Sequence, residues 1–152
     1  MKNQTGTYAI VLKPKSKRTI KVGKLGLLKI QDGYYVYVGS AFGPGGLKAR
    51  IAHHKRRSHR SRWHIDYLRT AAQICEVWYT YDQKHREHQW AEMLSTMKAG
   101  MITSPGFGSS DCSCPAHLCY FKSKPTIAAF RRRLYDKIKD HEKIFIDYAT
   151  DR

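Results

Sequence analysis

The chain has 152 residues, and its 41% hydrophobic and 12% aromatic content suits one packed domain and argues against global disorder. Its 28 Lys and Arg residues outnumber 12 Asp and Glu residues, so the formal net charge of +16 favours a polyanionic partner such as nucleic acid. Neither a membrane-length apolar run nor the apolar stretch of a signal peptide is visible, so we expect a soluble cytoplasmic protein without a membrane partner.

The front half of the chain is predicted to form an antiparallel meander. Short runs of β-forming residues predict strands at 7–12, 18–22, 25–30 and 34–40. Asp32-Gly33 is a strong hairpin signal between the last two of these strands. Alternation places Tyr8 on one face of the first strand and Tyr37 on one face of the last, and we expect both on the exposed face of the sheet.

The second half mixes helices with two further strands. Helices are predicted at 47–55, 63–68 and 85–97, the last from its helical spacing of apolar residues. Strands are predicted at 74–81 and 117–121, and a Gly/Ser/Cys-rich segment predicts a loop at 104–115. Pro125 suits the first turn of a final helix at about 125–139. We therefore expect one domain over residues 1–152, with its core at about 6–121. Its class is α/β of the α+β kind, with a small, mainly antiparallel central sheet flanked by helices.

Two strand tyrosines, Tyr8 and Tyr37, are candidates for catalysis. The reference pKa of tyrosine is about 10, so a catalytic tyrosine needs positive neighbours, such as Arg50 or a bound cation. The alternative for both residues is ordinary packing, because most strand tyrosines are amphipathic packing residues.

Arg50 and His54 project from one side of a predicted helix because they are four residues apart. The planar guanidinium of arginine binds two phosphate oxygens, and a neighbouring histidine can hydrogen-bond the phosphate or pass a proton to the leaving oxygen. Basic residues surround this pair and are predicted to contact a nucleic-acid backbone or simply to form a solvated face: Lys48, Lys55, Arg56, Arg57, Arg60 and Arg62.

Glu87 extends the apolar stripe of Trp90, Ala91 and Leu94, which follow it by three, four and seven residues. A carboxylate aimed at the interior is costly unless a cation or hydrogen-bond donors meet it. A single carboxylate suits one Mg²⁺ or Mn²⁺ ion, with waters and phosphate oxygens completing the shell. The alternative is that Glu87 stabilises the first turn of its helix.

Three cysteines crowd into eight residues near the end of the predicted loop. Cys112, Cys114 and His117 give C-x-C-x-x-H, and Cys75 or Cys119 could complete four zinc ligands. The C-x-C spacing is tighter than in the usual zinc knuckle, and free cysteines are often buried as small hydrophobes. Structural zinc is therefore the less favoured interpretation.

Gly6-Thr7-Tyr8 and Tyr37-Val38-Gly39 resemble the two tripeptides that give the GIY-YIG nuclease superfamily its name. As in that superfamily, a glycine-rich turn leads into a helix bearing Arg50 and His54, and Glu87 falls on a later helix. The segments 37–41, 45–47, 63–68 and 106–118 further resemble the Uri-type endonuclease branch. Two features depart from the pattern. The interval between the tyrosines is longer than in compact members, and Ser40 stands where many relatives carry a lysine.

The resemblance implies metal-assisted hydrolysis of DNA. Tyr8 would activate or position the attacking water with support from Tyr37. Arg50 would stabilise phosphoryl charge, His54 would assist at the same phosphate, and Glu87 would hold the metal ion. The alternative is a noncatalytic nucleic-acid-binding module on the same fold. RNA stays open as a partner, and the sequence predicts no oligomeric state.

Overall fold

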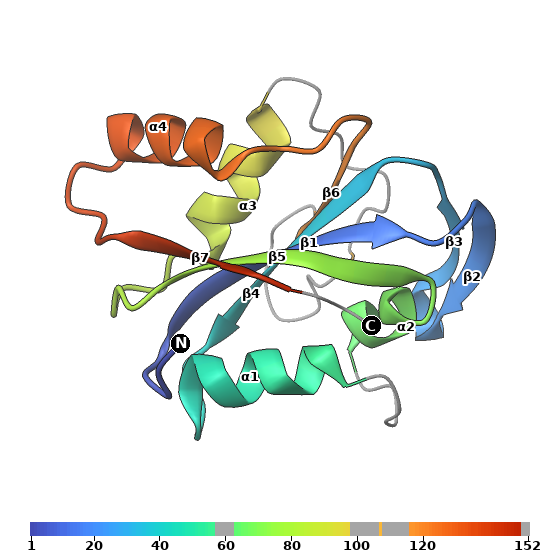
Figure 1. Cartoon of the computed structure of the whole chain (residues 1–152), viewed down its shortest axis with the longest axis horizontal. Helices are drawn as coiled ribbons and strands as arrows, with labels where there is room; N and C mark the ends of the chain where they lie inside the picture. Colours follow the sequence, from blue (N-terminus) through green and yellow to red (C-terminus); the bar gives the residue numbers. More distant parts are fainter. Residues whose placement is uncertain (57–62, 98–106, 108–115, 150–152) are drawn as a thin grey trace.

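The structure is a computed structural model that describes residues 1–56, 63–97, 107 and 116–149 (Figure 1). Its centre is a five-stranded sheet with the strand order β6-β4-β1-β5-β7, in which every neighbouring pair is antiparallel. The strands are β1 (Gly6–Pro14), β4 (Tyr34–Ala41), β5 (Ala72–Thr80), β6 (Leu118–Phe121) and β7 (Ile144–Tyr148). The first strand of the chain therefore lies in the middle of the sheet.

Both faces of the sheet are covered. One face carries the helices α1 (Gly46–Lys55) and α2 (His64–Arg69) and a separate two-stranded sheet of β2 (Arg18–Val22) and β3 (Gly26–Ile30), joined by the short 3-10 helix η1 (Gly23–Leu25). The other face carries α3 (Glu87–Thr96) and α4 (Ile127–Lys137), above the sheet in Figure 1. Because helices cover both sides of β1, its residues are buried without alternation from 6 to 12. The predicted α+β class is confirmed.

The helices bury the stripes that the sequence indicated. Leu47 and Ile51 of α1 pack under the sheet, and Trp90 and Leu94 of α3 pack on the opposite face. The Thr126 side chain caps α4 by accepting a hydrogen bond from the Ala129 backbone N–H at 3.2 Å. This capping residue fixes where the last helix begins, two residues after Pro125.

The predicted front-half meander is wrong, and so is the hairpin at Asp32-Gly33. β3 pairs with β2, whereas β4 pairs with β1 and β6, so the turn at 31–33 connects two different sheets. The physical reason is burial. The apolar side chains of the β2–β3 hairpin lie in the same core as the tyrosine face of the central sheet: Ile20, Val22, Leu28 and Ile30.

The prediction that Tyr8 and Tyr37 lie on an exposed face is also wrong. Tyr8 is 1% exposed and Tyr37 is 9% exposed, because α1, α2 and the β2–β3 hairpin cover that face. The edge strand β7 was not predicted from the sequence. Its side chains are mostly half-buried and pair with β5 at the outer edge, so they lack a strong alternating signal.

Within the described ranges no helix has both the length and the apolar composition needed to cross a bilayer. The longest described helix is α4, with 11 residues, whereas a helical span needs about 20. The cytoplasmic location stays a prediction.

Candidate active site

Each glycine of the two tyrosine motifs allows a close approach that a side chain would block. Tyr8 of β1 pairs with Gly39 of β4, and a Cβ atom on Gly39 would lie 2.4 Å from the Tyr8 hydroxyl oxygen. A Cβ atom on Gly6 would lie 1.9 Å from the backbone oxygen of Thr80 on β5. Gly39 therefore makes room for the Tyr8 ring, and Gly6 allows β1 and β5 to pair closely at this end of the sheet.

We expect Gly39→Ala to displace the Tyr8 ring and to lower the free energy of unfolding by about 1–3 kcal/mol, as overpacking of a core does. Gly43→Ala is the matched control, because no atom lies within 4 Å of a Cβ atom built there. Urea unfolding of both variants measures the difference. Equal stabilities for the two variants would show that the Tyr8 ring does not depend on this space.

Tyr8 and His54 form the centre of the site. The Tyr8 hydroxyl and His54 Nε2 are 2.6 Å apart, and both side chains are buried between the sheet and α1. Burial, together with the charges of His53, Arg50 and Arg69, lowers the pKa of His54 to about 3, while the Asp66 charge opposes this shift. Burial raises the pKa of Tyr8 well above its usual range, whereas the Arg50 guanidinium lowers it. At neutral pH the pair is therefore a neutral imidazole and a protonated phenol.

The direction of this hydrogen bond depends on the tautomer of His54. His54 Nδ1 is buried and has no hydrogen-bond partner among the residues that the structure describes. A buried N–H without an acceptor is rarer in proteins than an unused acceptor, so we assign the hydrogen to Nε2. His54 then donates to the Tyr8 oxygen, a bond that favours the phenolate when the phenol loses its proton.

His54 should make the free energy of unfolding decrease as the pH is lowered. Its pKa is about 6.5 in an unfolded chain and about 3 in the folded protein, so between these values the unfolded chain binds more protons. The contribution is complete above about pH 6.5 and falls by about 1.4 kcal/mol per pH unit below it. Between about pH 7.5 and 4.5, wild type should lose about 2–3 kcal/mol more than His54→Gln in urea unfolding with EDTA. Parallel losses in the two proteins would contradict a buried, neutral His54.

Tyr37 lies beside this pair. Its ring centroid is 6.4 Å from that of Tyr8, 6.0 Å from that of His54 and 6.1 Å from that of Phe107. Burial and the charge of Glu87 raise the pKa of Tyr37, and Arg50 lowers it. In this position Tyr37 packs the rings together and remains a neutral phenol.

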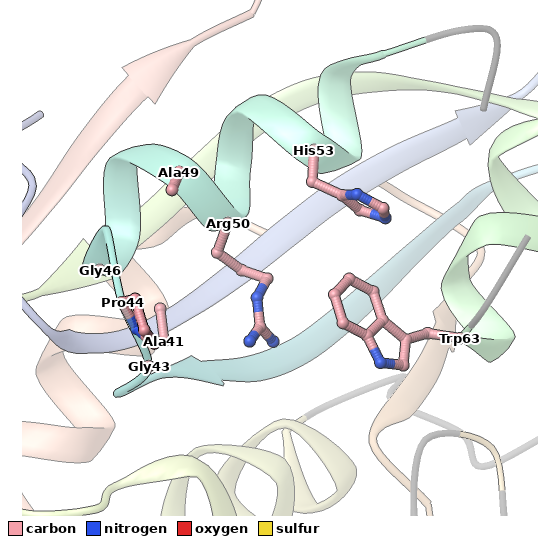
Figure 2. Close-up of a pocket in the computed structure, with 8 residues that line it drawn as sticks. All are labelled: Ala41, Gly43, Pro44, Gly46, Ala49, Arg50, His53 and Trp63. Carbon is pink, nitrogen blue, oxygen red and sulfur yellow. The ribbon is translucent and has the colours of Figure 1, made fainter. Parts of the chain in front are cut away.

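Arg50 faces a pocket of about 140 Å³ (Figure 2). Its Nη1 donates to the Ser40 backbone oxygen at 3.1 Å, and its guanidinium lies 4.6 Å from the centre of the Trp63 ring. The pocket is lined by Ala41, Gly43, Pro44, Gly46, Ala49, Arg50, His53 and Trp63. The other predicted site residues do not line it: Tyr8, Tyr37, His54 and Glu87.

Glu87 is the first residue of α3, and its side chain is 22% exposed. Its carboxylate oxygens lie 3.8 Å from His117 Nδ1 and 4.0 Å from His88 Nε2, and its charge raises the pKa of Tyr8 and of Tyr37. A half-exposed carboxylate whose field reaches both phenols suits a hard divalent cation that keeps most of its waters.

Arg86 fixes the start of α3 next to β1. Its backbone N–H donates to Thr7 Oγ1 at 3.4 Å, and its Nε donates to the buried Asp82 carboxylate at 3.1 Å. Asp82 also accepts from the backbone N–H groups of Lys84 and Glu142. This network places Glu87 one residue after an anchored position, which the sequence pattern did not reveal.

The cysteine prediction is only partly within the described residues, because Cys112 and Cys114 lie outside them. His117 is next to Glu87, and Cys119 is buried among the residues under α3 and α4, where burial raises the pKa of its thiol to about 11. Cys75 lies on β5, separated from β6 by two strands of the sheet. Cys119 therefore matches the interpretation of a buried small hydrophobe, and the zinc prediction stays untested.

The predicted phosphate contacts are partly visible. Lys48, Lys55 and Arg56 are exposed on and directly after α1, on the same helix as Arg50. Arg57, Arg60 and Arg62 lie outside the described residues. The exposed residues are available to a polyanion, and their partner stays a prediction.

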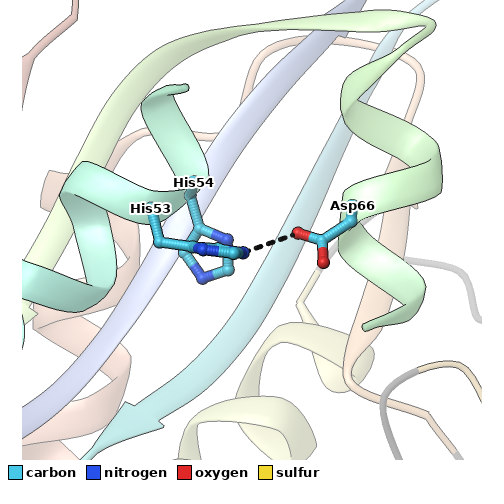
Figure 3. A group of neighbouring side chains, drawn as sticks. All are labelled: His53, His54 and Asp66. Carbon is cyan, nitrogen blue, oxygen red and sulfur yellow. Dashed lines mark hydrogen bonds and ion pairs between the residues drawn. The ribbon is translucent and has the colours of Figure 1, made fainter. Parts of the chain in front are cut away.

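A second polar group beside His54 was missed. His53 Nε2 and Asp66 Oδ1 are 3.1 Å apart, and Asp66 Oδ2 accepts from the Trp63 backbone N–H at 2.9 Å (Figure 3). Arg69 Nε donates to the His54 backbone oxygen at 2.8 Å, which satisfies a carbonyl at the end of α1. In the sequence, Asp66 stands between apolar residues of a predicted helix, which could have indicated a buried carboxylate. Its partner, His53, depends on how α1 and α2 pack.

A family model described as "Domain of unknown function DUF123" matches residues 7–140. The match spans β1 to α4 and so includes every predicted catalytic residue. Comparisons with curated proteins and with solved structures found no match.

Proposed function

Since this chain belongs to the DUF123 family, which is GIY-YIG-like, we propose that it is a metal-dependent endonuclease hydrolysing DNA phosphodiester bonds. The observation that carries the proposal is the 2.6 Å hydrogen bond between Tyr8 and His54, which lie 46 residues apart. Two residues picked out by separate motifs come into direct contact there, with Tyr37 against both rings.

Charged side chains of both signs act on this pair, as phosphodiester hydrolysis requires. Arg50 acts on the Tyr8 hydroxyl through its positive charge, and the Glu87 charge acts on it from α3. Arg50 also reaches the adjacent pocket, where its guanidinium can meet a phosphate. The charges of a cation on α1 and of an anion on α3 thus both act on the Tyr8 phenol.

In the proposed reaction, Tyr8 in its phenolate form positions the attacking water and accepts its proton. His54 holds the Tyr8 oxygen through Nε2–H, and Arg50 binds the phosphoryl oxygens, on which negative charge increases in the transition state. Glu87 would hold the cation, which when bound supplies charge neutralisation near the leaving oxygen. Tyr37 keeps the Tyr8 and His54 rings in place by packing.

Burial of Tyr8 sets a condition on this mechanism. A phenol whose pKa is well above 10 is a weak proton acceptor at neutral pH, so the Arg50 charge and the His54 hydrogen bond must favour the phenolate. Cleavage should therefore be faster in mildly alkaline solution.

Within the superfamily, we propose that this chain resembles the Uri-type branch most closely. The segments 37–41, 45–47 and 63–68 support this assignment, and they include the Trp63 and Asp66 side chains that border Arg50 and His53. The rival proposal, a noncatalytic nucleic-acid-binding module, is favoured by the deep burial of Tyr8 and His54.

Incubation with plasmid, branched and single-stranded DNA, in Mg²⁺ or in EDTA, separates the two proposals. We expect wild type to cut at least one substrate in Mg²⁺ and none in EDTA, and Glu87→Gln to bind without cutting. If wild type and Glu87→Gln both shift DNA in a gel and leave every substrate intact, the binding module is the correct function.

A further inference from the structure

Two adjacent histidines of α1 and one aspartate of α2 form a compact group outside the proposed Mg²⁺ site. His53, His54 and Asp66 each offer one ligand atom, and these atoms all lie within 4.8 Å of one another. The two imidazole rings are nearly perpendicular, with centroids 5.6 Å apart, and Figure 3 shows the Asp66 carboxylate directed toward His53. Imidazole nitrogen and carboxylate oxygen together are a donor set that divalent transition metals prefer.

An unsatisfied atom points to a ligand at this group. Nδ1 of His54 is fully buried and hydrogen-bonds to no described residue, although Nε2 of the same ring bonds Tyr8. Buried polar atoms without a partner are rare in folded proteins and call for an ion, a water or a function. Figure 3 shows one nitrogen of the His54 ring on the side that faces His53 and Asp66.

We propose that His53, His54 and Asp66 bind one divalent transition metal ion of the Zn²⁺ class, at a site distinct from Glu87. The ligand atoms of a tetrahedral zinc site lie about 3.3 Å apart, given metal–ligand bonds of about 2.0–2.1 Å. The His53 and Asp66 atoms are already 3.1 Å apart, so small side-chain rotations bring all three atoms to this spacing.

Neighbouring charges and the adjacent pocket determine how a cation could bind at this group. The positive charges of Arg50 and Arg69 act on His54 and oppose a cation, and the buried Asp66 carboxylate compensates. His53 is 18% exposed and lines the pocket that holds Arg50, so an ion can enter from that side. Three protein ligands leave a fourth position for a water or a phosphate oxygen from the pocket.

The consequence for catalysis rests on the proposed function. A metal ion on His54 Nδ1 keeps the hydrogen on Nε2, where it is donated to the Tyr8 oxygen. The ion thereby fixes the tautomer of His54 and positions Tyr8. His53 and Asp66 act through this ion as positioning residues.

Calorimetric titration with Zn²⁺, in excess Mg²⁺ and without DNA, tests the site on the full chain. A Cys112→Ser/Cys114→Ser background removes the two cysteines of the C-x-C-x-x-H motif. We expect this background to bind one Zn²⁺, and His53→Gln to weaken binding at least about tenfold, because it removes a ligand from the shell. His85→Gln, which removes an exposed imidazole elsewhere, and Glu87→Gln should bind as the background does.

Asp66→Asn serves as a second ligand variant, and thermal unfolding with and without Zn²⁺ shows that each variant is folded. The proposal is overturned if the Cys112→Ser/Cys114→Ser background binds no Zn²⁺, or if His53→Gln and Asp66→Asn bind it unchanged. Loss of binding only in Glu87→Gln would place the ion at the other site. Because no DNA is present, failure of the cleavage assay leaves this result unaffected.

Discussion

Replacing Arg50 by alanine is expected to lower kcat/KM for DNA cleavage by at least about 10³-fold, the scale found for arginines that stabilise a phosphoryl transition state. The guanidinium lies over Trp63 beside the pocket and acts on Tyr8, so its loss removes charge stabilisation where the phosphate reacts. Affinity for DNA should change less than about tenfold, because one phosphate contact among many contributes little to overall binding. Single-turnover cleavage in Mg²⁺, with binding measured in Ca²⁺, separates the two quantities.

Two controls make the Arg50 result specific. Lys48→Ala removes an exposed cation two residues away on the same helix and should leave the cleavage step unchanged. Lys55→Ala/Arg56→Ala should weaken binding and reduce the slope of log affinity against log salt by about 1.8, from about 0.9 per phosphate contact. Arg50 has no special part in the reaction if Arg50→Ala and Lys48→Ala slow cleavage equally.

Tyr8→Phe, which removes one oxygen, is expected to slow cleavage by about 10²–10⁴-fold, the range for loss of a general base. The change leaves both ring nitrogens of His54 without a protein partner, so we also expect the free energy of unfolding to fall by about 1–3 kcal/mol. Tyr35→Phe is the matched control. Tyr35 is buried on β4 and its hydroxyl accepts from the Gln31 backbone N–H at 3.1 Å, outside the site.

The pH dependence sharpens the Tyr8 test. Burial holds the pKa of Tyr8 above 10, so the phenolate fraction increases tenfold with each pH unit below that value. The wild-type rate should rise with this slope from about pH 7 to 9, and the residual rate of Tyr8→Phe should not follow it. Identical rates and pH profiles for Tyr8→Phe and Tyr35→Phe would rule out Tyr8 as the proton acceptor.

The sequence predicted the parts of the site that depend on local spacing. Arg50 and His54 are one helical turn apart, so their common side of α1 follows from the helix period alone. The structure adds the register of the two motifs, in which Tyr8 pairs with Gly39, and a side chain at Gly39 would overlap the Tyr8 ring.

The parts that failed depend on tertiary packing. The Asp32-Gly33 signal is the same whether the flanking strands pair with each other or with other strands, so it could not place the β2–β3 hairpin over Tyr8. The His53–Asp66 contact joins two helices whose relative position the sequence pattern does not contain. The burial of Tyr8 and Tyr37, which raises both pKa values, follows from that same packing.

Anomalous diffraction from crystals grown with a short DNA duplex and Mn²⁺ would locate the metal ion relative to the phosphate. We expect a manganese peak bonded to the Glu87 carboxylate, with a DNA phosphate oxygen in the same shell and the Arg50 guanidinium and Tyr8 hydroxyl facing that phosphate. A duplex bound only along Lys48, Lys55 and Arg56, with no manganese at Glu87, would contradict this expectation.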